Sequence, residues 1–247
     1  MGLLPGISMA EQDLALGQET LHVWSGRLDV DATALEAYAL VLSDDELARA
    51  NRFRFDKDRT HFVVTRGVLR YLLGAYIHVP AQEVAFGYGQ KGKPKLANPE
   101  TGVCFNVSHS HGMGAWAFGL NRSVGIDVEY VKRSVNIEAV GKRFFSDNEW
   151  VQLCHLPEAE RRNSFFRCWT RKEAFVKALG DGLTFSFKAF DVTIGDMSQV
   201  QHIEGVHDPQ NWLLKTFKPA PDYVGALAVE GQVKVVHHHL MPHDETV

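Results

Sequence analysis

The chain has 247 residues, of which 45% are hydrophobic and 23% are charged, and its formal net charge is -4. These values suit a compact globular protein with a core of its own, built as one large or two small domains. They exclude a general binder of nucleic acid or of anionic membranes, so any phosphate site must be a local cluster of Lys and Arg. The three cysteines are far apart and form no C-x-x-C pair, which favours reduced thiols in a cytosolic protein.

The N-terminus shows no targeting signal. The N-terminal segment lacks the basic start and the apolar run of a signal peptide. No apolar stretch reaches the ~20 residues that a membrane-spanning helix needs. We therefore expect a cytoplasmic protein, and we expect His237, His238 and His239 to belong to a solvated tail.

Apolar and β-branched residues predict a series of short strands, and helical spacing predicts helices between them. The predicted strands are 21–26, 83–88, 103–107, 114–119, 124–130, 187–194, 212–217 and 223–229. Two short helices begin with a capping box, in which a Ser caps the helix and a Glu three positions later bonds back. These boxes are Ser43 with Glu46 and Ser146 with Glu149.

The order of elements repeats itself along the chain. Segment 42–47 resembles 145–150, 65–74 resembles 170–180, and 114–117 resembles 225–228. The offset stays at about 105 residues through all three matches, which is the mark of an internal duplication. In both copies a glycine, Gly74 or Gly180, is placed to end a long helix.

The duplication predicts an α+β fold of two similar α/β halves with pseudo-twofold symmetry, about 20–122 and 123–236. With the chain ends included, the domains are 1–122 and 123–247. Ligands favour the interface between such units, so we expect the active site in the cleft between the halves. Because the second half takes the place of a partner subunit, we expect a monomer.

Two carboxylates share one face of the predicted strand 124–130. Side chains alternate along a strand, so Asp127 and Glu129 lie on one face, about 7 Å apart. Two such carboxylates repel each other and suit a shared hard cation such as Mg²⁺. A strand with a solvated acidic face is the alternative.

A helix predicted over 159–179 carries an acid and a base in one stripe. Trp169, Glu173 and Lys177 recur every four residues, so they lie on the same face. An exposed Glu–Lys ion pair is the simple interpretation. The aromatic start of the stripe favours partial burial, where a metal and a phosphate would be suitable partners for the two charges.

Two further segments carry groups that bind phosphate. Lys91, Lys93 and Lys95 lie in a glycine-rich loop that can hold a phosphate or can be a basic, solvated hairpin. Ser108 and His109 end a strand and can bond phosphate oxygens, and His109 can accept a proton. Adjacent strand residues point to opposite faces and no G-x-S-x-G motif is present, which argues against a serine hydrolase.

A basic, aromatic stretch at 52–59 includes Lys57 and leads into a helix that carries Arg66. A nucleotide site uses such groups. An amphipathic helix with solvated arginines has the same composition.

Taken together, these segments resemble the Sfp-type phosphopantetheinyl transferases, the larger, pseudo-dimeric branch of that family. Similarity is good over roughly 45–190, and the shorter holo-acyl-carrier-protein synthase branch resembles one half only. The matching strings are Lys91-Gly92-Lys93-Pro94, Phe105-Asn106-Val107-Ser108-His109-Ser110, Val124-Gly125-Ile126-Asp127-Val128-Glu129, Arg143-Phe144-Phe145-Ser146, and Trp169-Thr170-Arg171-Lys172-Glu173-Ala174 with Lys177.

The resemblance implies an enzyme that moves the 4′-phosphopantetheine arm of coenzyme A onto a serine of an apo carrier protein. Asp127, Glu129 and Glu173 would hold Mg²⁺, and Lys177 would contact the transferring phosphate. Glu173, or a water held by the metal, is the expected base, with His109 as the second candidate. The partner would be an acyl, peptidyl or polyketide carrier protein.

The resemblance also implies a coenzyme A site on the first half of the chain. The expected binding residues are Lys57, Lys91, Lys93, Ser108, His109 and Lys177, to which we add Arg66 from its charge and helix position. Two other functions remain open: a Mg²⁺-dependent phosphohydrolase, and a protein that binds coenzyme A without turnover. The sequence does not choose among carrier proteins or between Mg²⁺ and Mn²⁺.

Overall fold

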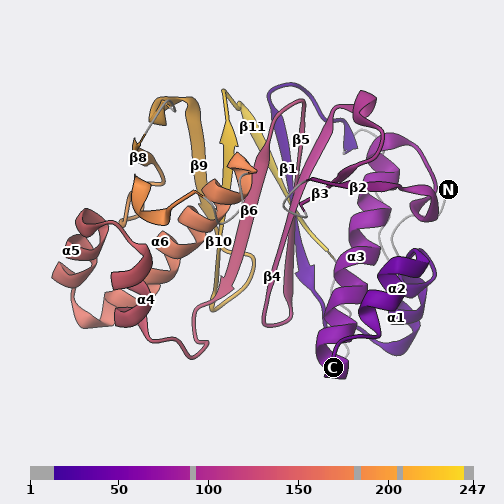
Figure 1. Ribbon diagram of the computed structural model, residues 1–247, viewed down its shortest axis with the longest axis horizontal. Helices are drawn as coiled ribbons and strands as arrows, with labels where there is room; N and C mark the ends of the chain where they lie inside the picture. Colours follow the sequence, from indigo (N-terminus) through magenta and orange to yellow (C-terminus); the bar gives the residue numbers. More distant parts are fainter. Residues whose placement is uncertain (1–13, 90–92, 181–184, 205–207, 242–247) are drawn as a thin grey trace.

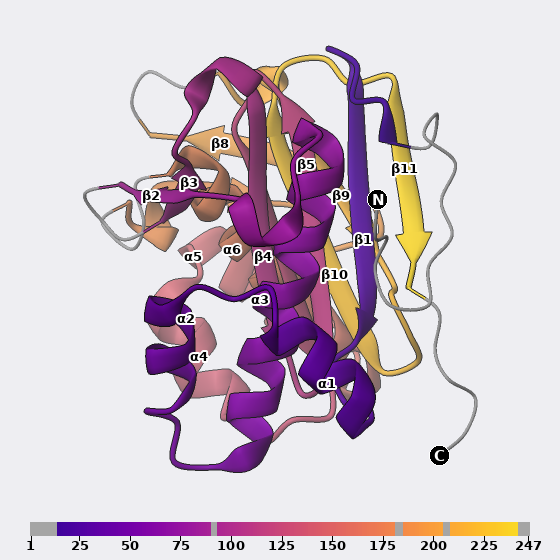
Figure 2. The ribbon, with the colours of Figure 1, turned by 90° about the vertical axis from the view of Figure 1, so that its right-hand side faces the viewer.

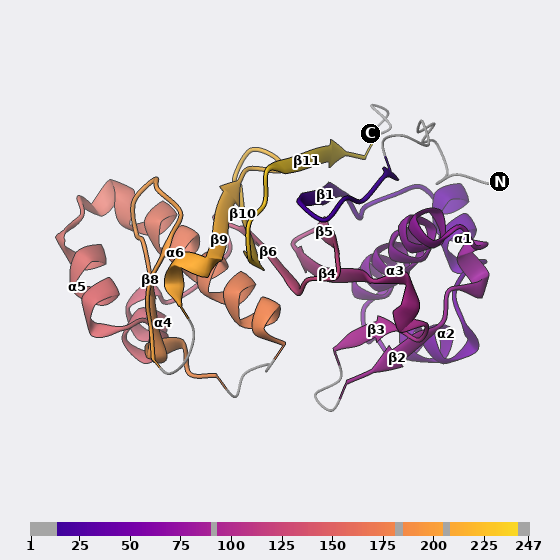
Figure 3. The same ribbon diagram turned by 90° about the horizontal axis from the view of Figure 1, so that it is seen from above.

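The computed structural model describes residues 14–89, 93–180, 185–204 and 208–241. The strands of its two large sheets stand together in the middle of the molecule, and helices lie at both outer sides (Figure 1). The view from above in Figure 3 separates the two groups of helices clearly. The mixed α+β fold that the sequence predicts is confirmed, while the pseudo-twofold symmetry and the domain boundary at 122 stay predictions.

The first part of the chain forms one group of helices and most of one sheet. Its elements are β1 (Thr20–Arg27), α1 (Ala32–Ala39), α2 (Asp44–Ala50), α3 (Asp56–Ile77), β2 (Phe86–Tyr88), β3 (Pro94–Leu96), β4 (Val103–Ser110) and β5 (Met113–Leu120). Buried side chains of α3, such as Leu69 and Leu72, pack with Trp24 of β1 and Trp116 of β5 in the core on this side. Burial of these apolar surfaces is the main force that holds the helices on the sheet.

The second part of the chain forms the other group of helices and the other large sheet. Its elements are β6 (Val124–Tyr130), α4 (Ile137–Phe144), α5 (Asp147–His155), α6 (Glu158–Leu179), β7 (Phe190–Val192), β8 (Val200–Ile203), β9 (Trp212–Phe217), β10 (Tyr223–Glu230) and β11 (Val235–Leu240). The strand order is β6-β10-β9 in this sheet and β11-β1-β5-β4 in the first. Within the described residues, no helix is long and apolar enough to cross a membrane.

The helix ends test the sequence predictions directly. Both capping boxes are present, at Ser43 and at Ser146. The left-handed Gly180, with φ of 75°, ends α6 as predicted. The prediction for Gly74 was wrong, because α3 continues past it and His78, with φ of 58°, caps the helix.

The C-terminal strand corrects a second prediction. His237, His238 and His239 lie in β11, which pairs in parallel with β1 and is drawn beside it in Figure 2. The ring of His239 stacks on Trp24 with 4.1 Å between centroids. The expectation of a tail was therefore wrong, although His237 and His238 are exposed to solvent as predicted. Strand β11 covers an edge of β1 that would otherwise expose unpaired backbone groups.

Side chains, rather than a backbone ladder, join the two large sheets. Alternate residues of β4, namely Asn106, Ser108 and Ser110, accept hydrogen bonds from backbone N–H groups of β6 at 2.9, 3.4 and 3.3 Å. Residues at i and i+2 of a strand share a face, so all three reach the same neighbour. This junction places the polar face of β4 beside the carboxylates of β6.

Helix α6 approaches β6 closely enough to exclude a side chain. A Cβ atom on Gly125 would lie 2.0 Å from the carbonyl oxygen of Ala174, so only glycine fits at this crossing. Two buried cations anchor the same helix. Arg171 donates to the carbonyl oxygen of Thr193 at 2.6 Å, and Lys172 donates to both oxygens of Glu149 at 2.7 Å. These contacts fix the height and rotation of α6 over β6.

Candidate active site

The carboxylate of Asp127 lies at the centre of the junction between the sheets. Its Oδ1 atom accepts hydrogen bonds from Ser108 Oγ at 2.8 Å and from Lys177 Nζ at 2.7 Å. Its Oδ2 atom is buried and has no hydrogen-bond partner among the described residues. A buried, unpaired carboxylate oxygen is costly, so this atom is placed to accept a cation or a donor from a ligand.

Glu173 reaches the same place from α6. Burial raises its pKa from 4.5 to about 7; the charge of Lys177 opposes the rise, and those of Asp127 and Glu129 add to it. No hydrogen bond from the described residues reaches this carboxylate. Glu173 is therefore a partly buried acid that can take up or release a proton near neutral pH.

Lys177 is one turn further along α6 and faces β6. Its ammonium group donates to Asp127 Oδ1 at 2.7 Å, to Ser108 Oγ at 3.2 Å and to the carbonyl oxygen of Ile126 at 3.2 Å. The simple interpretation of an exposed ion pair with Glu173 was wrong, because the ion-pair partner is Asp127. The lysine is held as a fixed positive charge beside both carboxylates.

Glu129 lies on the same face of β6 as Asp127, as the alternation predicts, but its oxygens are occupied. Oε2 accepts from Ser110 Oγ at 2.8 Å, and Oε1 accepts from Arg133 Nη2 at 2.9 Å. Burial and the charge of Asp127 raise the pKa of Glu129, while Ser110 and Arg133 act in the opposite direction. Each oxygen of the Glu129 carboxylate therefore already has one hydrogen-bond donor, from Ser110 or from Arg133.

A three-carboxylate metal site is not assembled in this arrangement. In the described part of the chain, no three His, Cys, Asp or Glu side chains come together closely enough to hold a metal ion. Asp127 and Glu173 have the chemistry that a hard divalent cation needs, with one unpaired oxygen and one free carboxylate. The assignment of all three carboxylates to one ion therefore stays a prediction.

Ser108 and His109 point to opposite faces of β4, as expected. Ser108 is buried against Asp127, whereas His109 is exposed. Partial desolvation lowers the pKa of His109, and the charges of His61 and Lys177 lower it further. The imidazole is thus accessible to a ligand and separate from the Ser108 hydroxyl, which argues against a serine–histidine pair.

The predicted coenzyme A residues have different surroundings. Lys57 is exposed, 3.9 Å from Asp29. Arg66 is committed to buried Glu46 at 2.7 Å, a contact that does not favour a role in ligand binding. Lys91 lies outside the described residues. These assignments all stay predictions.

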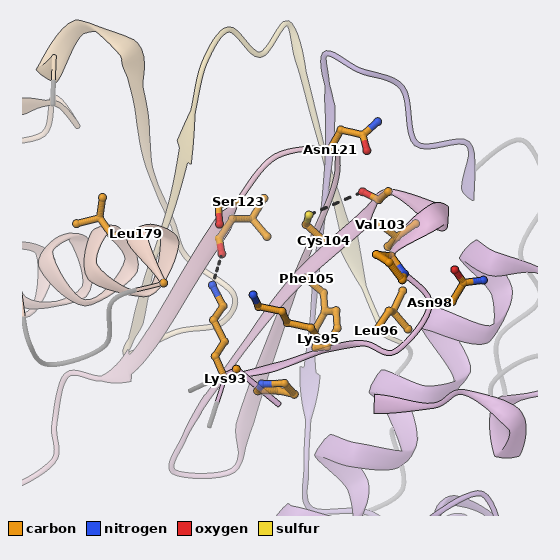
Figure 4. Close-up of a pocket in the computed structure, with 16 residues that line it drawn as sticks. Lys93, Lys95, Leu96, Asn98, Val103, Cys104, Phe105, Asn121, Ser123 and Leu179 are labelled. Carbon is orange, nitrogen blue, oxygen red and sulfur yellow. Dashed lines mark hydrogen bonds between the residues drawn. The ribbon is translucent and has the colours of Figure 1, made fainter. Parts of the chain in front are cut away.

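Lys93 borders a cavity of about 620 Å³ that Phe105, Val124 and Leu179 also line; Asp127, Glu129 and Glu173 are not among its lining residues. Its ammonium group donates to the carbonyl oxygen of Lys177 at 2.6 Å, and desolvation lowers its pKa to about 8. Figure 4 shows Lys93 and Lys95 extending between Phe105 on one side and Leu179 on the other. The cavity has the size and mixed lining of a small-molecule site.

Sequence reasoning missed Ser110 and Arg133 as members of the site. Ser110 is two residues after Ser108, so strand alternation places it on the same face. Arg133 follows Glu129 by four residues, but it lies beyond the end of β6, where no periodic rule applies. The first could have been found from its spacing and the second could not.

Comparison with known proteins decides the family. The model named "4'-phosphopantetheinyl transferase superfamily" matches residues 123–228, and the one named "4'-phosphopantetheinyl transferase, N-terminal" matches residues 30–117. The chain is 37% identical over 221 residues to the 4′-phosphopantetheinyl transferase HetI of Nostoc sp. strain PCC 7120, covering 89% of this chain and 91% of HetI.

The chain belongs to the 4′-phosphopantetheinyl transferase superfamily.

Other members of the superfamily fit this assignment. The 4′-phosphopantetheinyl transferase Sfp of Bacillus subtilis is 28% identical over 76% of this chain and 82% of its own. A crystal structure of Thermotoga maritima holo-acyl-carrier-protein synthase aligns with a TM-score of 0.37 and 25% identity, over 45% of this chain and 64% of that one. The two family models and the identities to HetI and Sfp confirm the resemblance to Sfp-type phosphopantetheinyl transferases.

Proposed function

We propose that this phosphopantetheinyl transferase moves the 4′-phosphopantetheine arm of coenzyme A onto a serine hydroxyl of an apo carrier protein, with a divalent cation such as Mg²⁺. The observation that carries the proposal is the group formed by buried Asp127 with partly buried Glu173 and Lys177, in which one acid has a pKa of about 7. The serine oxygen forms a bond to the β-phosphorus, the pyrophosphate P–O bond breaks, and 3′,5′-ADP leaves.

Each residue of the group has a task that its contacts support. Glu173 accepts the proton of the attacking serine, because its pKa near neutrality suits a general base at physiological pH. Lys177, fixed by three acceptors, places a positive charge beside the phosphoryl oxygens. Phosphoryl transfer depends mainly on such positioning and charge neutralisation.

Asp127 and Glu173 are the carboxylates that fit a divalent cation best. When bound, such a cation supplies Lewis-acid polarisation of the pyrophosphate and stabilises the leaving group. Asp127 presents its unpaired Oδ2 for this purpose, and Ser108 and Lys177 keep Oδ1 fixed. Coenzyme A would be held by Lys57, Lys93 and His109 at the edge of the first half.

The test is a transfer assay on a panel of apo carrier proteins with coenzyme A and Mg²⁺. Mass spectrometry should show a gain of one phosphopantetheine on the carrier serine, and the Glu173→Gln variant should lose this activity while it still binds coenzyme A. Phosphate release from coenzyme A with unmodified carriers would indicate a phosphohydrolase instead. Binding without turnover by the wild type on every carrier would indicate a binding protein.

A further inference from the structure

Lys93 links the first part of the chain to the catalytic helix through its side chain. Its backbone carbonyl oxygen accepts a hydrogen bond from Gly89 at 3.0 Å, which fixes the residue in the β2–β3 hairpin. Its ammonium group donates to the carbonyl oxygens of Lys177 in α6 at 2.6 Å and of Val124 in β6 at 3.5 Å. In Figure 4 this side chain extends toward the strand that begins beside Ser123. Within the described residues, no other hydrogen bond joins the hairpin to α6.

The carbonyl oxygen of Lys177 lies in the last turn of α6. The helix ends at Leu179, and Gly180 follows with φ of 75°. Carbonyl groups in the last turn of a helix lack an N–H partner within the helix, and the helix dipole places partial negative charge there. An ammonium group at this end provides both a donor and a positive charge. Lys93 therefore caps α6 from a segment that is distant in the sequence.

The capped residue also supplies a side chain to the candidate active site. The ammonium group of Lys177 donates to Asp127 at 2.7 Å and to Ser108 at 3.2 Å. A shift of the last turn of α6 would move this ammonium group together with the backbone. A misplacement of about 1 Å in such a group can cost up to about 10²-fold in rate.

The charge of Lys93 is present under ordinary assay conditions. Desolvation lowers its pKa to about 8; repulsion by Lys95 and Lys177 acts in the same direction, and Cys104 acts in the opposite one. At pH 7 the ammonium form therefore predominates, and the contact with the end of α6 can be tested at that pH.

We propose that Lys93 is a positioning residue for the transfer reaction, which caps the C-terminal end of α6 from the β2–β3 hairpin and thereby holds Lys177 in place beside Asp127. The effect on the reaction rests on the proposed function. The contact itself can be tested without a carrier protein.

The first test measures amide hydrogen exchange of the full-length protein at pH 7, without coenzyme A. Lys93→Met removes the ammonium group and keeps an unbranched side chain, so peptides covering 170–179 should exchange about tenfold faster than in the wild type. Lys95→Met is the matched control, because this exposed lysine lies on the same hairpin, and its exchange should stay within about twofold. Lys93→Arg keeps the cation and should restore slow exchange.

The second test separates positioning of α6 from direct contact with the substrate. With coenzyme A varied at pH 7, Lys93→Met should lower kcat about tenfold. Its KM for coenzyme A, and its Kd from calorimetry, should stay within about threefold of the wild type. Lys93→Arg should recover most of the lost kcat. Thermal unfolding checks that each variant is folded, and Lys93→Gln replaces Lys93→Met if that variant does not fold.

The outcomes separate this inference from the proposed function. If exchange in α6 is the same in Lys93→Met and the wild type, Lys93 does not hold the helix end and the inference is wrong. If KM and Kd rise about tenfold while kcat is unchanged, Lys93 acts by contacting coenzyme A and the inference is again wrong. If the wild type modifies no carrier protein, the proposed function fails, whereas hydrogen exchange still decides whether Lys93 caps α6.

Discussion

Replacing Glu173 by glutamine should make the protein more stable at alkaline pH while it removes activity. In the native state the pKa of this carboxyl is raised from 4.5 to about 7, mainly by burial. Between those two pH values the unfolded chain loses the proton and the folded chain keeps it. The stabilising contribution of Glu173 is thus fully present below pH 4.5 and is lost as the pH rises through 7. Glutamine does not titrate, so the stability of the variant does not fall in this way as the pH rises.

The size of the effect follows from the shift. Each unit of pKa difference corresponds to about 1.4 kcal/mol, so a rise from 4.5 to about 7 gives an upper limit of about 3.4 kcal/mol. Because the side chain is partly exposed, we expect about 2 kcal/mol in the difference between pH 5 and pH 8. In a protein of this size that corresponds to roughly 4–8 °C in Tm.

The assay is urea unfolding of wild type and Glu173→Gln at pH 5 and pH 8, with EDTA present so that bound metal does not contribute. The variant should gain stability relative to the wild type on going to pH 8. In the transfer assay it should lose 10²–10⁴-fold in rate, as expected for removal of a general base. A stability difference that does not depend on pH would refute the raised pKa, whatever the effect on activity.

Two further substitutions test the packing that supports the site. Gly125→Ala should destabilise the protein by at least about 3 kcal/mol, since the new Cβ meets the Ala174 carbonyl oxygen, whereas Gly195→Ala, with open space around it, should be tolerated. Lys172→Met should cost about 3–5 kcal/mol by leaving Glu149 charged and buried, whereas Lys142→Met, which breaks an exposed ion pair, should cost less than about 0.5 kcal/mol. Urea unfolding measures all four, and equal midpoints within either pair would contradict the packing argument.

Local patterns in the sequence predicted the parts of the site that depend on periodicity. Strand alternation placed Asp127 and Glu129 on one face of β6, and helical spacing placed Glu173 and Lys177 on one face of α6. The capping boxes succeeded for the same reason, because all their hydrogen bonds lie within four residues. Such rules need only neighbours along the chain.

The contacts that the sequence did not predict are ones that no periodicity along the chain describes. Lys177 pairs with Asp127, 50 residues away, rather than with its helical neighbour Glu173. Arg66 pairs with Glu46, which the sequence placed only in a capping box, and its predicted role in binding coenzyme A stays a prediction. Gly74 does not end a helix. It allows the backbone that follows α3 to approach the helix closely, since a Cβ on Gly74 would lie 2.6 Å from the carbonyl oxygen of Val79. Spacing along the sequence does not predict any of these contacts.

The parallel pairing of β11 with β1 has a consequence for synthesis of the chain. Thr20 is matched with Val235, so the two partners emerge from the ribosome about 215 residues apart. At translation rates of 5–20 residues per second, the outer edge of β1 stays unpaired for roughly 10–40 s before β11 has been synthesised. During that interval the nascent chain presents an open strand edge, and protection of this edge by a chaperone would matter more here than for a sheet completed early.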